Sequence, residues 1–501
     1  MEAVGPAKSY LLTTEGFVVN DNGDDSFIKK NNSLKLTEAG KYIIKGQDLE
    51  DYVAGRIQIQ AEDIEVTLED VWLEYTNGAT INTKFDTDIV ILGENHLSRL
   101  IDLEDDPTED GGKVIKGESE TIGEGVDITF TGDGTLNIDA PKKGIGVDVF
   151  VEGWEFENGL DENGEKRSVD LDATITIDGP TLNITAAHEC IEANIIRFIS
   201  GQGMLISTGD DGINVGVDVD DSDEDDLDGD GNTREKLYPN VQYSYTDLDI
   251  IFDGGTWYIE SADDGIDSNG HVHFNGGEVV VYGSTASDNA AVDYGQESSG
   301  EFVVDGGVLL AVGNSTMQSM PKGLYLFTRG LNIKAGDKIA ILDADGNELF
   351  SSWAPDDKNG ANCVLYCGPE LVEGETYYIK VGANEPIEVE AKMGDGSSGE
   401  PSGGPSRNAS GEASGNARGK ASGNASGEVK IASQELDIGI VTTYDFGDVK
   451  IHAYAASDEL DEAAYAVESD HALVGVSMPA NGKAYAAWTE YLEGLEKEMK
   501  D

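Results

Sequence analysis

The sequence predicts an all-β protein whose main domain is a parallel β-helix, and three observations lead to this prediction. A glycine-containing turn followed by a short alternating apolar strand recurs six times along the 501-residue chain. The shortest recurring step between these turns is 22 residues, which suits one coil of a parallel β-helix. No helical periodicity separates the strands, and the 63 glycines fit a chain with many turns.

The repeat can be registered on the first glycine of each turn. These glycines are Gly132, Gly179, Gly201, Gly254, Gly276 and Gly306. Their spacings are 47, 22, 53, 22 and 30, so the longer steps are interpreted as 22 plus insertions of 25, 31 and 8 residues. One coil cannot bury its apolar face alone, so the coils are expected to stack about 4.8 Å apart.

Alternation within the strands predicts which side chains face the core. The first core column is expected to contain Leu182, Met204, Trp257 and Val279. The second is expected to contain Ile184, Ile206, Ile259 and Val281. Trp257 is therefore predicted to fill the core, and Tyr258, one residue further on, to point outward.

The flanking segments complete the expected domain organisation. Strand-rich residues 33–101 are expected to supply the first coils and their cap, so the β-helix covers 1–320. Hairpin signals predict a small β-rich cap at 321–393. The composition of the Gly/Ser/Asn-rich stretch 394–428 predicts a flexible linker. Residues 429–501 are expected to form a small α+β domain, because their strands precede aromatic residues at helical spacing in "AYAAWTEYLEGLEKEMKD".

The charge and the cysteines limit the class of protein. A net charge of −65 excludes nucleic acid and an anionic membrane as direct partners. No apolar run reaches the length of a membrane span. The start "MEAVGPAKSY" lacks the features of a signal peptide, so the chain is expected to be cytosolic or a mature exported form. Cys363 and Cys367 are close enough in sequence to form a disulfide, and Cys190 has no evident partner, which leaves the compartment open.

Carboxylates occur at equivalent places in the repeat, just before each Gly-Ile pair. The first column of such positions is Lys142, His188, Asp210, Asp263 and Asp288. The second column is Lys143, Glu189, Asp211, Asp264 and Asn289. A third, just after the turn, is Glu192, Asn214 and Asp267.

Like charges on neighbouring coils destabilise the stack, by a few kcal/mol per pair at an effective dielectric near 20. A cation would compensate them, and hard oxygen ligands at adjustable distances suit Ca²⁺. The alternative is that each aspartate is a solvated residue that stabilises its own turn. Repetition over three coils favours the metal.

The 31-residue insertion contains a second calcium candidate, "DDLDGDGNTRE", with Asp226, Asp228 and Asp230. This is the opening of a calcium loop, but Leu237 stands where an EF-hand needs its bidentate glutamate, so a standard EF-hand is excluded.

Several segments together resemble a family of bacterial carbohydrate-binding proteins. They are "LKLTEAGKYIIKG", "GRIQIQAEDIEVTLEDVWLEYTNGATINTKFDTDIVILGENHLS", the repeated "GG-strand-DDGI" coils and "LDADGNELFSS…PELVEGETYYI", which cover roughly 33–390. The resemblance implies a right-handed parallel β-helix related in shape to the pectate lyases. It also implies calcium ions along the coils, export to the cell surface, and binding of acidic plant cell-wall polysaccharides such as polygalacturonate.

This chain departs from the family pattern at Lys142-Lys143 and at His188-Glu189, where later coils have acids. The implied metal ligands therefore carry over only to Asp210, Asp211, Asp263, Asp264, Asp267 and Asp288.

The leading hypothesis for function is a secreted, monomeric, calcium-dependent module that binds acidic polysaccharide without catalysis. Bridging Ca²⁺ would join the carboxylates of both partners despite the negative charge of the protein. Tyr258, Tyr243 and Tyr245 are candidates for stacking on sugar rings.

Two alternatives stay open. A lyase would need calcium and a Lys or Arg base, but Lys142 and Lys143 are expected about 10 Å from Asp210 by the strand spacing. A hydrolase could use aspartates on adjacent coils. A structural or adhesive surface protein is the other alternative, with 429–501 as a docking domain.

Overall fold

The structure is a computed structural model in which the chain forms two compact units, 1–405 and 406–501. In the first unit it describes residues 7–19, 32–47, 49, 51–76, 78–100, 112–119, 125–148, 167–169, 172–216, 241–243, 248–287, 289–295, 299–356 and 358–395. In the second it describes the four strands alone, 440–445, 449–454, 463–469 and 473–478.

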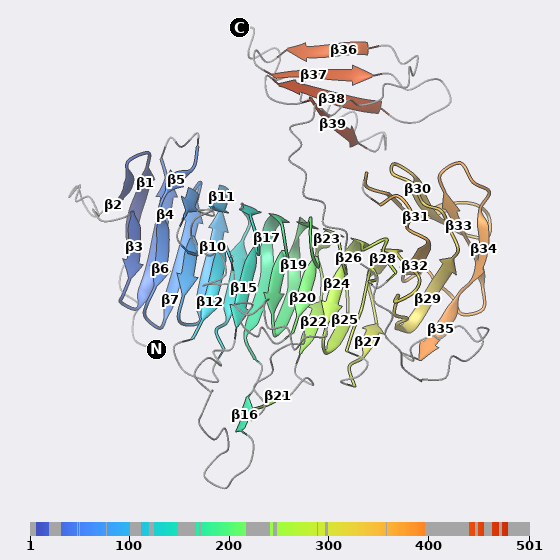
Figure 1. Ribbon diagram of the computed structural model, residues 1–501, viewed down its shortest axis with the longest axis horizontal. Helices are drawn as coiled ribbons and strands as arrows, with labels where there is room; N and C mark the ends of the chain where they lie inside the picture. Colours follow the sequence, from blue (N-terminus) through green and yellow to red (C-terminus); the bar gives the residue numbers. More distant parts are fainter. Residues whose placement is uncertain are drawn as a thin grey trace, which may run out of the picture. The chain divides into compact units, whose positions relative to one another are not determined.

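Most of the first unit is a β-helix-like stack of parallel strands with three rows (Figure 1). The first row contains β1 (Lys8–Thr13), β4 (Gly40–Gly46), β7 (Ile64–Glu69), β10 (Thr87–Leu92), β13 (Ile128–Gly132), the first part of β17 (Thr174–Ala186) and of β19 (Ile195–Ser207), β22 (Asp249–Phe252), β25 (His271–Phe274) and β27 (Phe302–Val304). The second row contains β5 (Val53–Ala54), β8 (Trp72–Tyr75), β11 (Glu94–Arg99), β14 (Thr135–Ala140), the later parts of β17 and β19, β23 (Thr256–Glu260), β26 (Glu278–Tyr282) and β28 (Val308–Gly313).

The third row is a separate eight-stranded parallel sheet. It contains β3 (Ser33–Leu36), β6 (Arg56–Ile59), β9 (Ile81–Thr83), β12 (Ile115–Glu118), β15 (Ile145–Asp148), β18 (Ile191–Ala193), β20 (Ile213–Val215) and β24 (Ile266–Ser268). Three short strands of the described residues stand apart from the rows: β2 (Gly16–Val19) pairs antiparallel with β1, and β16 (Arg167–Val169) pairs with β21 (Val241–Tyr243). The prediction of stacked parallel coils is confirmed, and the right hand of the coil stays a prediction.

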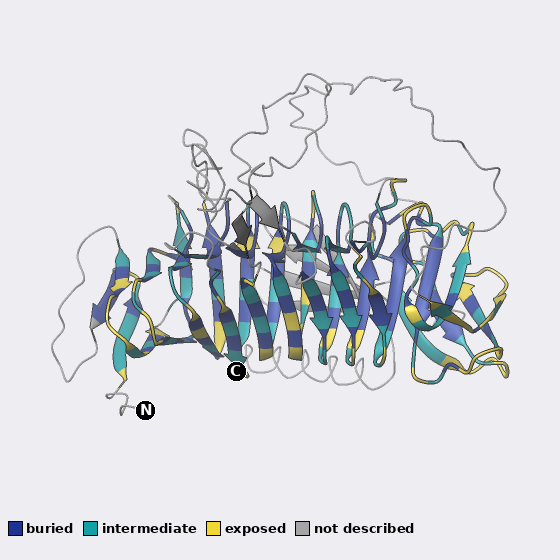
Figure 2. Cartoon of the chain, turned by 90° about the horizontal axis from the view of Figure 1, so that it is seen from below, coloured by how far each residue is buried: buried dark blue, intermediate teal, exposed yellow. Residues whose placement is uncertain are grey.

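The core lies inside the stack, where buried residues alternate with partly exposed ones along many of the strands (Figure 2). Phe198, Phe252 and Phe274 of successive coils stack with ring centroids 4.6 and 4.8 Å apart. Trp257 packs on Phe198 at 4.7 Å and is 1% exposed, so it fills the core as predicted. Identical side chains at equivalent positions stack because neighbouring coils lie one strand spacing apart.

The prediction that Met204 and Ile206 face the core is wrong. Leu182 pairs with Gly203 and Ile184 with Leu205, so Leu205 is buried while Met204 is 47% exposed. The cause is a double irregularity between β17 and β19, where the register shifts on both sides of Asp178. The glycines of the two turns lie 22 residues apart, but the strands after them pair at a step of 21, and a one-residue slip reverses the face of every side chain.

The remainder of the first unit is antiparallel, in the region predicted as a β-rich cap. Its strands are β29 (Lys322–Arg329), β30 (Lys338–Leu342), β31 (Glu348–Trp353), β32 (Cys363–Cys367), β33 (Thr376–Val381), β34 (Ile387–Glu390) and β35 (Lys392–Asp395). Strand β32 pairs with both β28 and β29. Cys363, Cys367 and Cys190 are free, buried thiols. The first two lie in one strand four residues apart, too far for a disulfide.

The second unit contributes β36 (Ile440–Asp445), β37 (Val449–Tyr454), β38 (Ala463–Ser469) and β39 (Leu473–Met478), which form an antiparallel sheet. The helix predicted near the C-terminus lies outside the described residues. The described part of the chain contains no helix, and therefore none that is long and apolar enough to cross a membrane.

Candidate functional site

The third-row sheet brings residues from successive coils into register. The middle residues of β18, β20 and β24, which are Glu192, Asn214 and Asp267, pair directly. One coil earlier the same position is Gly146, which pairs with Lys116 in the coil before it. Equivalent positions in a parallel stack lie one strand spacing apart, so this column places three polar side chains along one line.

The corners that lead into these strands align in the same way. The amide of Gly212 donates to the carbonyl of Asp264, and the amide of Asp263 donates to the carbonyl of Asp210. Asp211 therefore faces Asp264, and Asp210 faces Asp263, on neighbouring coils.

Asp211 is buried and Asp264 is partly buried, and neither carboxylate has a cationic partner among the described residues. Asp211 is 9% exposed, and its Oδ1 accepts a hydrogen bond of 2.8 Å from the amide of Asp264. Oδ1 of Asp264 accepts a hydrogen bond from the amide of Ala290. These backbone donors hold both carboxylates at the corner of the coil.

Burial and mutual repulsion disfavour the charged forms of these groups. Burial raises the pKa of Asp211 well above its ordinary value, and Asp267, Asp264 and Asp210 raise it further. Burial raises the pKa of Asp264 to about 8, against the smaller opposing effect of its bond from Ala290. The charged forms of these carboxylates are thus electrostatically unfavourable at neutral pH.

Asn214 adds a neutral oxygen to this group. Its Oδ1 is buried and accepts no hydrogen bond from any described residue. A buried acceptor without a donor costs about 1–3 kcal/mol of free energy. Together with the facing carboxylates of Asp211 and Asp264, this oxygen indicates that the group is suited to a cation.

The alignment of the coils by sequence did not identify Asp293 as a member of this group. An isolated bridge pairs Ile266 with Val292, which places Asp293 next in line after Asp267. Asp293 also contributes to the raised pKa of Asp264, after burial and Asp267. Matching "AAVD" of residues 290–293 to "DGID" of 264–267 would have found it.

The same register places Ala290 opposite Asp264, because the amide of Gly265 donates to the carbonyl of Ala290. The predicted alignment of the Asp288 coil is therefore displaced by one residue, and Asn289, not Asp288, falls opposite Asp263. Asp288 itself lies outside the described residues. We call Asp211, Asn214, Asp264, Asp267 and Asp293 the acidic cluster.

Earlier coils compensate their carboxylates with lysines. Nζ of Lys143, 5% exposed, lies 2.9 and 3.0 Å from the two carboxylate oxygens of Glu192 and 3.7 Å from Glu189. Lys113, 1% exposed, lies 3.4 Å from Glu192. Of the two lysines considered as the base of a lyase, Lys143 is thus buried and held by carboxylates, whereas Lys142 is partly exposed.

His188 occupies the first column between these two regions. Its Nδ1 lies 3.3 Å from Oδ2 of Asp210, and both side chains are partly exposed. The ion pair with Asp210 raises the pKa of His188. The side chain of Asp210 is therefore turned toward His188, while Asp211 belongs to the acidic cluster.

The tyrosine candidates for sugar stacking are not brought together in the described part of the chain. Tyr258 points out of the stack as predicted, but its ring packs 5.8 Å from that of Tyr282 and its hydroxyl donates to Glu260 at 2.8 Å. It is partly covered by the apolar cluster that includes β30, β32 and β33. Tyr243 lies in β21, whose side chains are not described, and Tyr245 lies outside the described residues, as do Asp226, Asp228 and Asp230.

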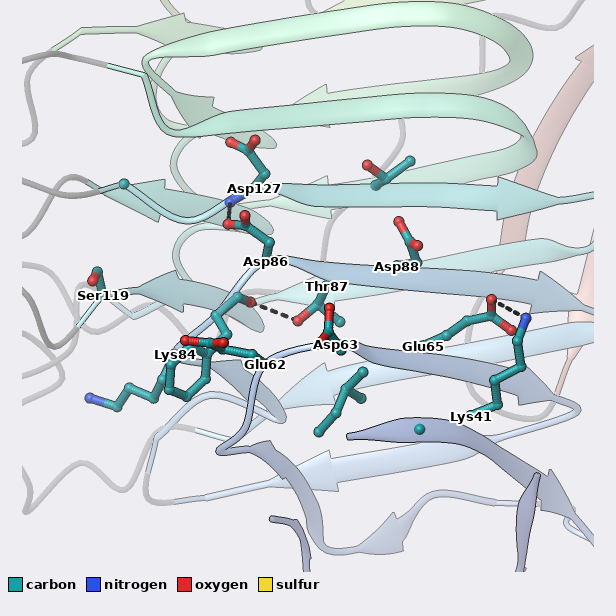
Figure 3. A pocket seen from close by; sticks show the side chains of 15 residues that line it. Lys41, Glu62, Asp63, Glu65, Lys84, Asp86, Thr87, Asp88, Ser119 and Asp127 are labelled. Carbon is teal, nitrogen blue, oxygen red and sulfur yellow. Dashed lines mark hydrogen bonds and ion pairs between the residues drawn. The ribbon is translucent and has the colours of Figure 1, made fainter. Parts of the chain in front are cut away.

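An open groove of about 910 Å³ lies on the first row, far along the stack from the acidic cluster. Its labelled side chains are mostly acidic; they come from β4, β7 and β10, from the corners before β7, β10 and β13, and from the residue after β12 (Figure 3). The amide of Asp127 donates to Asp86, and Asp127 in turn accepts from the amide of Thr174. Burial, followed by repulsion from Asp86, raises the pKa of Asp127. These aspartates have the bonding of corner-stabilising residues.

The chain was compared with solved structures, curated proteins and protein families. The chain is similar to a solved structure, the polysaccharide lyase-like protein from C. thermocellum in its gadolinium derivative, with 19% identity and a TM-score of 0.36 over 61% of this chain and 94% of that chain. No curated protein matches the chain. Residues 156–290, which include the columns from His188 to Asp267, match the family model described as carbohydrate-binding domain-containing protein. The matched stretch contains every member of the acidic cluster except Asp293.

Proposed function

We propose that the first unit binds acidic polysaccharide of the pectin type, such as polygalacturonate, through Ca²⁺ held by the acidic cluster. The observation that carries the proposal is the pair Asp211 and Asp264, two desolvated carboxylates on neighbouring coils that face each other without a cation from the described part of the protein. The family match over residues 156–290 supports the carbohydrate part of the proposal.

The donor set fits calcium better than other biological cations. Asp211, Asp264, Asp267 and Asp293 offer carboxylate oxygens, and Asn214 offers an amide oxygen that is buried without a donor among the described residues. An all-oxygen set with both charged and neutral members is what Ca²⁺ prefers in proteins. The ion would remove the repulsion within the cluster and would supply positive charge for carboxylates of the glycan.

Ca²⁺ would also explain how a negatively charged protein binds a negatively charged glycan. A chain of net charge −65 repels a polyuronate, and this repulsion is strongest at low ionic strength. Ca²⁺ with coordination positions open to the ligand attracts glycan carboxylates, so binding is expected to require calcium and to discriminate against neutral glucans.

We further propose that the protein acts outside the bacterial cell, at its surface, and as a monomer. Weak calcium sites with dissociation constants of about 10⁻⁴–10⁻³ M are typical of extracellular modules. All members of the acidic cluster come from one chain, so one copy suffices. Catalysis is not part of the proposal; of the two lysines considered as a lyase base, Lys143 is held by Glu192 and Glu189.

The test is a calorimetric titration of Ca²⁺ into the EDTA-stripped full chain, with polygalacturonate binding measured before and after. Stoichiometric Ca²⁺ uptake that is followed by polygalacturonate binding, with no binding of a neutral glucan, is expected. Asp211→Asn and Asp264→Asn should weaken both steps. Equal glycan binding in EDTA and in Ca²⁺ would contradict the proposal, and release of unsaturated, ultraviolet-absorbing products would identify a lyase instead.

A further inference from the structure

His188, Glu189 and Asp210 form a second cluster of potential metal ligands beside the acidic cluster. Each residue offers one ligand atom, and these atoms all lie within 4.8 Å of one another. They come from two neighbouring coils: His188 and Glu189 precede β18, and Asp210 precedes β20. The set differs chemically from the acidic cluster because it contains an imidazole nitrogen.

The buried member of this set lacks a hydrogen-bond donor. Glu189 is 6% exposed, and its Oε2 accepts no hydrogen bond from any described residue. The ammonium of Lys143 lies 3.7 Å from that oxygen, too far for a hydrogen bond, and it donates to the two carboxylate oxygens of Glu192 at 2.9 and 3.0 Å. A buried carboxylate oxygen in this condition is costly, and a cation between Glu189 and the His188–Asp210 pair would satisfy it.

We propose that His188, Glu189 and Asp210 bind a divalent transition metal of the zinc type, separately from the calcium of the acidic cluster. Imidazole with carboxylates suits Zn²⁺ and its neighbours, whereas Ca²⁺ takes oxygen ligands. Zn²⁺ bonds of about 2.0–2.1 Å in a tetrahedron require ligand atoms roughly 3.4 Å apart. The 3.3 Å between Nδ1 of His188 and Oδ2 of Asp210 fits this requirement.

The position of the cluster leaves room for an exchangeable ligand. The side chains of His188 and Asp210 are 39% and 34% exposed, while that of Glu189 is 7% exposed. A metal held by three protein ligands at the surface of the coil keeps a fourth position toward solvent, as in open zinc sites. Water or an oxygen of a bound glycan would occupy it.

Lys142, in the preceding coil, has the opposite effect on the site. The amide of His188 donates to the carbonyl of Lys142 at 3.1 Å, and the lysine charge acts against a positive charge on His188. The same charge disfavours a metal ion. Because a metal takes neutral imidazole as its ligand, protons compete with it at His188, so affinity should rise with pH.

The experiment uses Co²⁺ as a spectroscopic probe in the metal-stripped full chain, with saturating Ca²⁺ present to fill the acidic cluster. We expect uptake of a single equivalent, visible absorption of low-symmetry Co²⁺, proton release on binding, and displacement of Co²⁺ by Zn²⁺. This outcome does not depend on glycan binding, so the experiment tests the inference independently of the proposed function.

His188→Asn and Glu189→Gln should each lower Co²⁺ affinity by at least about 100-fold. Loss of a residue that only supports a ligand already costs about 10–100-fold, and these two residues are proposed as direct ligands. Lys142→Gln should raise it. His273→Asn is the matched control, because His273 also pairs with an aspartate, Asp249, at 2.8 Å but belongs to no such three-ligand cluster among the described residues. Unchanged Co²⁺ binding in His188→Asn, an equal loss in the control, or displacement of Co²⁺ by Ca²⁺ would overturn the inference.

Discussion

The ammonium nitrogen of Lys143 lies 2.9 Å from one carboxylate oxygen of Glu192 and 3.0 Å from the other, although the two residues belong to neighbouring coils. One coil further on, Asn214 takes the position of Glu192, and Asp211 follows Glu189 in the column that Lys143 begins. The same columns therefore hold cations of the protein in the earlier coils and carboxylates in the later ones. Lys143 thus supplies a positive charge beside Glu192 from the protein itself.

Replacing Lys143 with methionine should destabilise the protein by about 3–5 kcal/mol, because Glu192 and Glu189 would stay buried near each other with less compensation. Added Ca²⁺ should restore part of this loss by taking the place of the ammonium. Urea denaturation with and without Ca²⁺ measures both effects.

The control for this variant is Lys45→Met. Lys45 pairs with Glu69 in the same manner across two coils, but both side chains are partly exposed, at 47% and 32%. The change should cost no more than about 1 kcal/mol and should not respond to Ca²⁺. Equal losses in the two variants would contradict a special role for the buried pair.

Stability of the metal-free protein should fall as the pH rises from about 4 to 8. The folded-state pKa of Asp264 is raised from 3.8 to about 8, so the folded state holds a proton that the unfolded state has already lost. The unfolded state therefore binds fewer protons in this range, and stability decreases with pH. Thermal unfolding in EDTA over a pH series tests this, and saturating Ca²⁺ should flatten the profile. A profile in EDTA that rises from pH 4 to 8 would contradict a desolvated Asp264 without a compensating charge.

Asp264→Asn should stabilise the EDTA-treated protein at pH 8 by at least about 1 kcal/mol, since one unit of pKa shift corresponds to about 1.4 kcal/mol. The amide keeps the acceptor for Ala290 and removes the charge. The variant should lose the stabilisation by Ca²⁺. The control is Asp178→Asn, because Asp178 is exposed and accepts a hydrogen bond from Ser200. This variant should change neither the stability in EDTA nor the stabilisation by Ca²⁺ by more than about 0.5 kcal/mol. A loss of stability in Asp264→Asn under EDTA would count against the interpretation.

Two adjacent residues test the register between β17 and β19. Leu205→Ala should cost about 2–5 kcal/mol because Leu205 is fully buried, whereas Met204→Ala should cost little because Met204 is 47% exposed. Chemical denaturation of the two variants in parallel decides between this register and the uninterrupted 22-residue step, which exchanges the two roles.

The three thiols should be unreactive in the folded protein and all reactive after denaturation without reductant. Cys190, Cys363 and Cys367 are free and buried, and burial raises the pKa of each thiol, which suppresses the reactive thiolate. A thiol-reactive dye counts them in both states. Fewer than three thiols in the denatured, unreduced protein would reveal a disulfide.

The sequence by itself determined the stacked parallel coils and most of the columns of aligned polar residues. A solenoid repeats the same local pattern, so the stack converts the sequence period directly into position. Once Gly-Ile pairs such as Gly212-Ile213 and Gly265-Ile266 are aligned, the facing of Asp211 and Asp264 follows. Tertiary structure alone decided the features that depend on irregular steps or on neighbours distant in sequence. The register shift beside Asp178 turned Met204 outward, and the pairing of Ile266 with Val292 brought Asp293 into line. The direction of a side chain toward one neighbour or another, as with Asp210 toward His188, depends on the electrostatics of the assembled coils, which a one-dimensional period does not contain.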